Sequence, residues 1–292
     1  MPLQLRWMAS HSASCFHAVA LIHDGVPFAD SEWHAMLVEP IAALLEQLSA
    51  TNLSPDRFLE HLVPQSAGID NKLQLARIAC QKAQGPMPEQ VITRLAGQIE
   101  AIEAAARRGA PKLLDELALR MGPLREQWEA RGPGLIKRIA DLTDPQLIAE
   151  SADVVLVHPA AGGAGTAHLQ YNSVRIEAVL FNPVAGIPEI VRLAWLLGQL
   201  QCDLPRFGES IPRHRLARIA SLAMAPAALV AGEYVECCRA NANSLGDALR
   251  AWRVPQPPDS ELLWDWWSSY QIDRPPWQIA IAALDTLVET RN

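Results

Sequence analysis

The chain has 292 residues, of which 50% are hydrophobic and 20% are charged, and its 32 acidic side chains outnumber its 25 basic ones, for a formal net charge of −7. This length and composition allow a sizeable core without disulfide or metal support and exclude the disordered and fibrous classes. The acidic balance argues against a general nucleic-acid binder, because binding to the phosphate backbone depends on Lys and Arg.

The cysteine pattern and the apolar runs indicate in which cellular compartment the protein lies. Five cysteines, without C-x-x-C spacing, indicate neither a disulfide framework nor a zinc ribbon. Polar residues at 10–14 interrupt the apolar residues near the start, so no signal-peptide core is expected. The longest apolar run, 219–231, is broken by Ser221 and Pro226 and is shorter than the ~20 residues that a membrane helix needs. We therefore predict a soluble, cytoplasmic protein without a transmembrane segment.

The first third of the chain changes from a strand-like to a helical pattern. Residues 15–23 are mostly apolar and are followed by Asp24-Gly25, which predicts a strand that ends in a turn. Helices are expected from Ser31 and from Ser54, each as an N-cap, and further helices at 68–83, 87–108 and 111–128. Residues 31–130 should therefore form a helical array.

Two breaks separate this array from a small β element, one at residues 131–134 (Arg-Gly-Pro-Gly) and one at Asp144-Pro145. Strands are expected at 153–158 and 174–181. Helices should follow at 188–201, at 212–252 with interruptions near Pro226 and Asn241, and at 259–270 and 276–289.

The predicted fold class is mainly α with a small β-sheet or hairpin, an α+β multi-helical globular protein. Strands at 15–23, 153–158 and 174–181 could pair with one another, which would join the first part of the chain to the part after residue 130. We therefore expect a single domain over residues 1–292, in which 131–292 contribute the β element and the helices after it.

A glycine-rich loop follows the expected strand at 153–158. Gly162, Gly163 and Gly165 resemble in composition a turn in which backbone amides bind a phosphate, which makes them candidate cofactor-binding residues. However, His168 stands where a third glycine of the dinucleotide pattern belongs, and no Gly-Lys-Ser/Thr follows. A hairpin loop is the favoured interpretation, and nucleotide binding is the weaker alternative.

Two histidines and a carboxylate flank this loop. His158, His168 and Glu177 have the residue types of a site for a divalent metal with two histidine ligands and one carboxylate ligand. The chain lacks the H-E-x-x-H helix that would bring two histidines one turn apart. Histidines that only form structural hydrogen bonds are the favoured interpretation, and a metal site is the alternative.

Charged residues also lie on the expected strand at 174–181 and on the helix that follows. Arg175 and Glu177 should share one face of the strand, while Leu180 should face the core. Glu189 and Arg192 open a helix that is apolar nearly all round, so they could join Arg175 and Glu177 in an internal ion network. If the protein is an enzyme, Arg175 or Arg192 could instead hold an anionic substrate.

Aromatic residues gather near the carboxyl terminus, and Trp264, Trp266 and Trp267 cannot all point in one direction from a helix. At least one ring should meet another segment or a partner. The leading functional hypothesis is therefore an interaction or regulatory protein that binds a protein partner or associates with itself. The alternative is a hydrolase-like enzyme in which His158, His168, Glu177, Arg175 and Arg192 perform catalysis, with or without a divalent metal.

Overall fold

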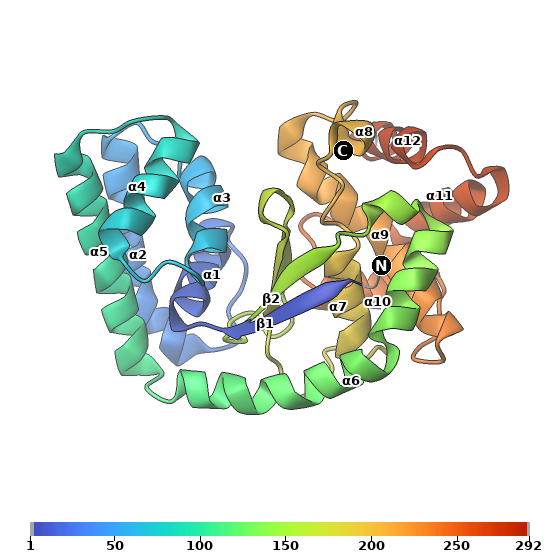
Figure 1. Cartoon of the computed structure of the whole chain (residues 1–292), viewed down its shortest axis with the longest axis horizontal. Coiled ribbons are helices and arrows are strands. Elements are labelled where there is room, and N and C mark those ends of the chain that lie inside the picture. Colours follow the sequence, from blue (N-terminus) through green and yellow to red (C-terminus); the bar gives the residue numbers. More distant parts are fainter. Residues whose placement is uncertain (1–2, 291–292) are drawn as a thin grey trace. The chain divides into compact units, whose positions relative to one another are not determined.

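The structure, a computed structural model, describes residues 3–290. The described chain is mainly helical, with twelve α-helices and one small four-stranded mixed sheet in the order β1-β2-β4-β3 (Figure 1). This confirms the predicted α+β fold class.

The strands are β1 (Gln4–Ala9), β2 (Ser151–Val157), β3 (Gly165–His168) and β4 (Ser173–Glu177). The helices are α1 (His11–His23), α2 (Ser31–Ala50), α3 (Pro55–Gln65), α4 (Lys72–Ala83), α5 (Glu89–Gly109), α6 (Leu113–Leu142), α7 (Glu189–Leu197), α8 (Pro205–Gly208), α9 (Arg213–Tyr234), α10 (Ala242–Ala251), α11 (Ser260–Asp273) and α12 (Trp277–Glu289).

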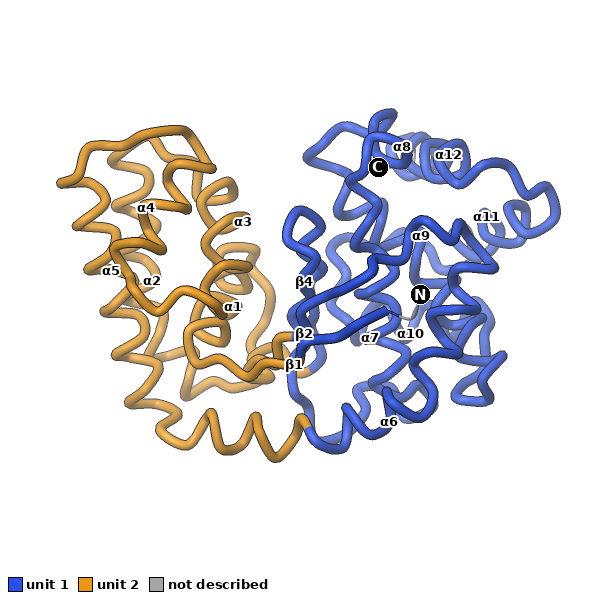
Figure 2. Tube along the Cα trace, in the orientation of Figure 1, with its two compact units in different colours: residues 1–6, 122–154, 163–292 blue, residues 7–121, 155–162 orange. Residues whose placement is uncertain are grey.

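The chain divides into two compact units (Figure 2). Of the described residues, unit 1 contains 3–6, 122–154 and 163–290, and unit 2 contains 7–121 and 155–162. Helices α1 to α5 therefore belong to unit 2 and α7 to α12 to unit 1, while α6 contributes residues to both. The division into two compact units does not test whether residues 1–292 form a single domain, so the single domain stays a prediction.

In unit 2, the expected helical array is present, and α5 packs against α2 and α4 while α3 packs against α4 and α1. The side chain of Ser54 caps α3 as predicted, but Asp30, rather than Ser31, caps α2. Apolar residues at helical spacing face inward on α5, where Ile92, Leu95 and Ile99 are buried.

The strand predicted at residues 15–23 is wrong, because this segment is the helix α1. Ser10 caps it, and its hydroxyl oxygen accepts a hydrogen bond from the amide of Ala13 at 3.1 Å. Every residue from Ala13 to Val19 is buried, including the polar Ser14 and His17, so the segment has no exposed face. A short run that is apolar all round cannot be identified as helix or strand from its periodicity.

Two predicted helix breaks are also wrong. Helix α6 continues through residues 131–134, and α9 continues through Pro226. Gly132 in α6 is required by packing and not by a turn, because a Cβ at this position would lie 2.4 Å from the ring of Trp128. In contrast, Asn241 does mark a boundary, since its side chain caps α10.

Unit 1 is built around α7, whose residues 190–197 are all buried and which packs against α9, as the apolar sequence predicts. Among the described helices, α9 is the one long and apolar enough to cross a membrane by length and composition, and 78% of its most apolar window is buried within the protein. That degree of burial is typical of a core helix.

Strand β4 differs from its prediction in length and in exposure. It pairs antiparallel with β3, with Thr166 opposite Arg175, and ends at Glu177. Both of its faces are buried, so Arg175 and Glu177 do not lie on a solvent face. The prediction that Leu180 faces the core is wrong, because Leu180 is 70% exposed and the neighbouring Phe181 is 84% exposed.

The loop before β3 requires glycine at residue 163. Gly163 has a φ of +148°, and a Cβ there would lie 2.6 Å from the carbonyl oxygen of Ala251 and 2.9 Å from Pro183. We expect Gly163→Ala to lower the free energy of unfolding by about 2 kcal/mol through backbone strain and overpacking. Urea unfolding followed by circular dichroism measures this. Gly186→Ala is the matched control, since no atom lies within 4 Å of its Cβ position, and equal losses in both variants would contradict the prediction.

Candidate functional site in unit 2

The amino end of α1 carries several of the polar residues of this largely buried helix. Ser10 caps the helix, and His11 and Ser12 occupy its first two positions. The first amides of an α-helix have no carbonyl partner within the helix, and the helix dipole makes this end electropositive. Ser12 therefore lies where negative charge is favoured.

Glu103 lies on the buried face of α5 and is only 2% exposed. Its side chain meets Lys72, the first residue of α4, with 2.5 Å between the lysine Nζ and the carboxylate Oε1. The side chain of Lys72 is 13% exposed. A carboxylate in this position needs opposite charge and hydrogen bonds to offset the loss of water, and Lys72 supplies both.

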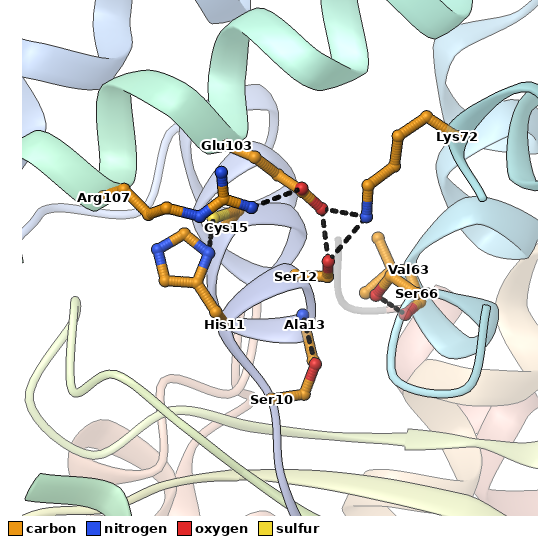
Figure 3. Close-up of polar contacts among 10 residues, drawn as sticks. All are labelled: Ser10, His11, Ser12, Ala13, Cys15, Val63, Ser66, Lys72, Glu103 and Arg107. Atoms are coloured by element: carbon orange, nitrogen blue, oxygen red, sulfur yellow. Dashed lines mark hydrogen bonds and ion pairs between the residues drawn. The ribbon is translucent and has the colours of Figure 1, made fainter. Parts of the chain in front are cut away.

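Ser12 completes this arrangement. The Nζ of Lys72 donates to the hydroxyl oxygen of Ser12 at 2.9 Å, and the hydroxyl of Ser12 donates to Glu103 Oε1. Arg107, one turn after Glu103 on α5, approaches the other carboxylate oxygen at 3.4 Å, and its side chain is 65% exposed. Figure 3 shows Ser12, Lys72 and Glu103 pointing toward one another from three helices. We call Ser12, Lys72, Glu103 and Arg107 the polar cluster.

Two cavities adjoin the polar cluster. The first has a volume of about 610 Å³ and is lined by Ser12, by His11 and by apolar side chains that include Leu113 and Leu114. The second, of about 620 Å³, extends along the amino end of α4 and the carboxyl half of α5. Both are lined by Asp70, Lys72, Glu103 and Arg107. The volume of the first cavity is within the range of small-molecule sites, and its lining is mixed polar and apolar.

His11 adds an imidazole to the first cavity. Its Nδ1 lies 3.5 Å from the Sγ of Cys15, while its buried Nε2 has no hydrogen-bond partner among the described residues. Burial lowers the pKa of His11, and the charge of Arg107 contributes to this shift. The ring is therefore neutral at neutral pH.

No family model, curated protein or solved structure matches the chain.

The residues proposed from sequence as a metal site lie in both units. His158 belongs to unit 2, where its Nε2 is 3.0 Å from the Oδ2 of Asp30 and its ring centroid is 4.4 Å from that of Trp33. His168 and Glu177 belong to unit 1. Among residues 3–290, no group of three or more His, Cys, Asp or Glu side chains could hold a metal ion. The metal hypothesis gains no support from this arrangement.

Within unit 1, the predicted charged residues form a buried network. Arg175 is fully buried, which lowers its pKa, and its Nη1 lies 2.6 Å from the Nε2 of His168 on the neighbouring strand. Arg192 pairs with Glu189 and donates hydrogen bonds to the carbonyl oxygens of Ala164 at 2.9 Å and Glu177 at 2.6 Å. Arg192 and Glu189 thus form part of the expected network, whereas Glu177 contacts Arg192 through its backbone carbonyl oxygen and Arg175 contacts His168.

Glu177 holds the glycine-rich loop. Its carboxylate accepts hydrogen bonds from the amides of Gly163 at 2.6 Å and Ala164 at 3.0 Å. Gly162 has a φ of +77°, and Gly165 begins β3. Because Glu177 already binds the two amides, a phosphate at the loop would have to displace its carboxylate. Cofactor binding by these glycines therefore gains no support.

The carboxyl-terminal aromatic residues pack within unit 1. Trp267, Tyr270 and Trp277 are buried, and the indole of Trp266 donates to the carbonyl oxygen of Ala280 on α12 at 3.2 Å. The expectation that a ring meets another segment is confirmed by this contact. The partner in this contact is another helix of the same chain.

The polar cluster was missed by the sequence-based reasoning. Ser12 and Lys72 are 60 residues apart, and Lys72 and Glu103 are 31 apart, so no local motif unites them. One signal was available: Glu103 follows Ile99 by four residues and so lies on the apolar face of a helix whose pattern is clear. A charged residue in such a face requires partners and marks a candidate site.

Removing the buried carboxylate should destabilise unit 2. We expect Glu103→Gln to cost about 3 kcal/mol of unfolding free energy, because the charge of Lys72 would remain in its mostly buried position without its nearest counter-charge. Urea unfolding followed by circular dichroism measures the loss. Glu100→Gln, on the exposed side of the same helix, is the control. A loss no greater than that of the control would contradict the assigned role.

The pKa of His11 tests whether burial and the charge of Arg107 act on this ring. We expect it to lie below the ordinary value of 6.5 in an NMR titration and to rise in Arg107→Gln, which removes a positive charge near the ring. Because the folded state resists protonation of this ring, the contribution of His11 to stability is present above the ordinary pKa and is lost as the pH falls. Arg108→Gln, at a neighbouring exposed position, is the control. An unchanged His11 pKa in Arg107→Gln would contradict the assignment.

Proposed function

We propose that the chain is a small-molecule-binding protein and that its first cavity in unit 2 is the binding site. The observation that carries this proposal is the convergence of Ser12, Lys72 and Glu103 at the wall of a cavity of about 610 Å³.

The lining indicates the class of ligand. Asp70, Glu103 and Asp115 contribute three negative charges, and Lys72 and Arg107 contribute two positive charges, for a formal total of −1. This balance disfavours a highly charged anion such as a polyphosphate. Apolar side chains cover another part of the wall. The ligand in this proposal is a neutral molecule with a carbonyl-type polar group and an apolar remainder.

A cytoplasmic location and a regulatory role belong to the same proposal. All five cysteines are free, which supports a reducing compartment. Ligand occupancy could regulate a partner protein or self-association. The buried carboxyl-terminal rings supply little exposed surface for such contacts, so ligand binding has the stronger physical basis.

Binding can be tested with N-phenylbutyramide, a neutral amide with apolar ends, and with butyrate as an anionic comparison. We expect saturation-transfer NMR to detect the amide on the wild-type protein, with weaker binding of butyrate. Ala67→Trp, which fills the cavity wall, should abolish the amide signal. Ala101→Trp, at an exposed position of α5 that lines neither cavity, should preserve it. Absence of amide binding to the wild-type protein, or equal binding to Ala67→Trp, would contradict the proposal.

A further inference from the structure

We propose that Ser12 is a nucleophile and that unit 2 hydrolyses carboxylic esters in the first cavity. This inference rests on the proposed function, because the substrate would occupy the same site. It adds chemistry to binding: Ser12 lines the cavity, and its hydroxyl already makes the two contacts that a reactive serine needs, with an acceptor for its proton and with a positive charge.

Glu103 is the group that accepts the proton. The hydroxyl of Ser12 donates its hydrogen bond directly to the Glu103 carboxylate, so proton transfer requires no rearrangement of either side chain. Lys72 donates to the oxygen of Ser12 at 2.9 Å and thereby stabilises the negative charge that develops there. The same ammonium group lies 2.5 Å from the carboxylate and orients it toward the serine.

The amino end of α1, where Ser12 lies, can also stabilise the negative charge that forms on the carbonyl oxygen of the substrate. The amides of His11 and Ser12 lie in the first turn, where no carbonyl of the helix can accept from them. Such amides, together with the helix dipole, stabilise the oxyanion that forms when a carbonyl is attacked. Nucleophile, base and electropositive helix end therefore meet at one wall of the cavity.

The steps balance without a cofactor. The Oγ of Ser12 bonds to the ester carbonyl carbon while its proton passes to Glu103, and the carbonyl oxygen takes the negative charge. The bond from carbon to the alkoxy oxygen then breaks, and the alcohol leaves with the proton from Glu103. Water attacks the acyl-serine, again giving a proton to Glu103. Breakage of the acyl–serine bond returns this proton to Ser12 and releases the carboxylic acid.

The substrate class follows from the wall of the cavity. Its volume of about 610 Å³ suits a small ester, and Leu113, Leu114 and Pro111 provide apolar contacts for an alkyl or aryl group. The formal charge of −1 on the lining residues favours neutral esters over esters that carry a carboxylate or phosphate.

The test uses the full chain and two probes. An alkyl fluorophosphonate reacts with activated serines, forming a serine–phosphorus bond with loss of fluoride, and mass spectrometry of the labelled wild-type protein identifies the modified residue. Hydrolysis of p-nitrophenyl butyrate gives the rate. We expect labelling at Ser12 and a fall in kcat/KM of at least ~10³-fold in Ser12→Ala. Ser49→Ala, at an exposed helical serine of unit 2, should keep the wild-type rate.

The outcomes separate the two proposals. Labelling of the wild-type protein needs no substitution, so a folding defect in Ser12→Ala cannot mask the result. If N-phenylbutyramide binds but Ser12 is not labelled and hydrolysis is equal in wild type and Ser12→Ala, the nucleophile proposal is overturned and the binding proposal stands. If Ser12 is labelled but no ester is turned over, hydrolysis is overturned. If neither binding nor labelling occurs, both proposals fall.

Discussion

The buried carboxylate of Glu103 is the constraint on which the arrangement of unit 2 depends. A charged group on the apolar face of a helix is costly unless protein atoms replace the water that it has lost. Lys72 from α4 and Ser12 from α1 provide those atoms, and both meet Glu103 on α5. The three helices are thus held by a polar requirement as well as by apolar packing, because a shift of any one would separate the carboxylate from a partner.

Unit 1 buries a carboxylate in a different way. Glu177 accepts from two backbone amides of the glycine-rich loop, and Arg192 binds the carbonyl oxygens of Ala164 and Glu177. The result is a loop closed on a buried strand. In unit 2, the corresponding groups are side chains at a cavity wall, where a ligand can reach them. Similar residue types therefore serve a structural purpose in one unit and form the candidate site in the other.

The helices of residues 31–108 could be predicted because long amphipathic segments carry a clear period and capping residues such as Ser54. Helix α1 could not, because a segment that is buried on all sides shows no amphipathic period in its sequence. The prediction of a break at Gly132 is wrong because this position needs glycine for a different reason: the ring of Trp128 lies too close to leave room for a Cβ. The candidate site could not be predicted, because its members come together only when α1, α4 and α5 pack.

The composition of α1 explains why Ser12 lies at this site. From Ala13 to Val19 the helix is buried throughout, and its amino end carries Ser10, His11 and Ser12. A helix of this kind can be buried only if its polar end meets polar partners, and its positive dipole favours an acidic one. Glu103 is such a partner. The burial of α1 and the position of the serine beside the carboxylate therefore have one physical cause, and the chemistry proposed for Ser12 depends on the same contacts that stabilise the fold.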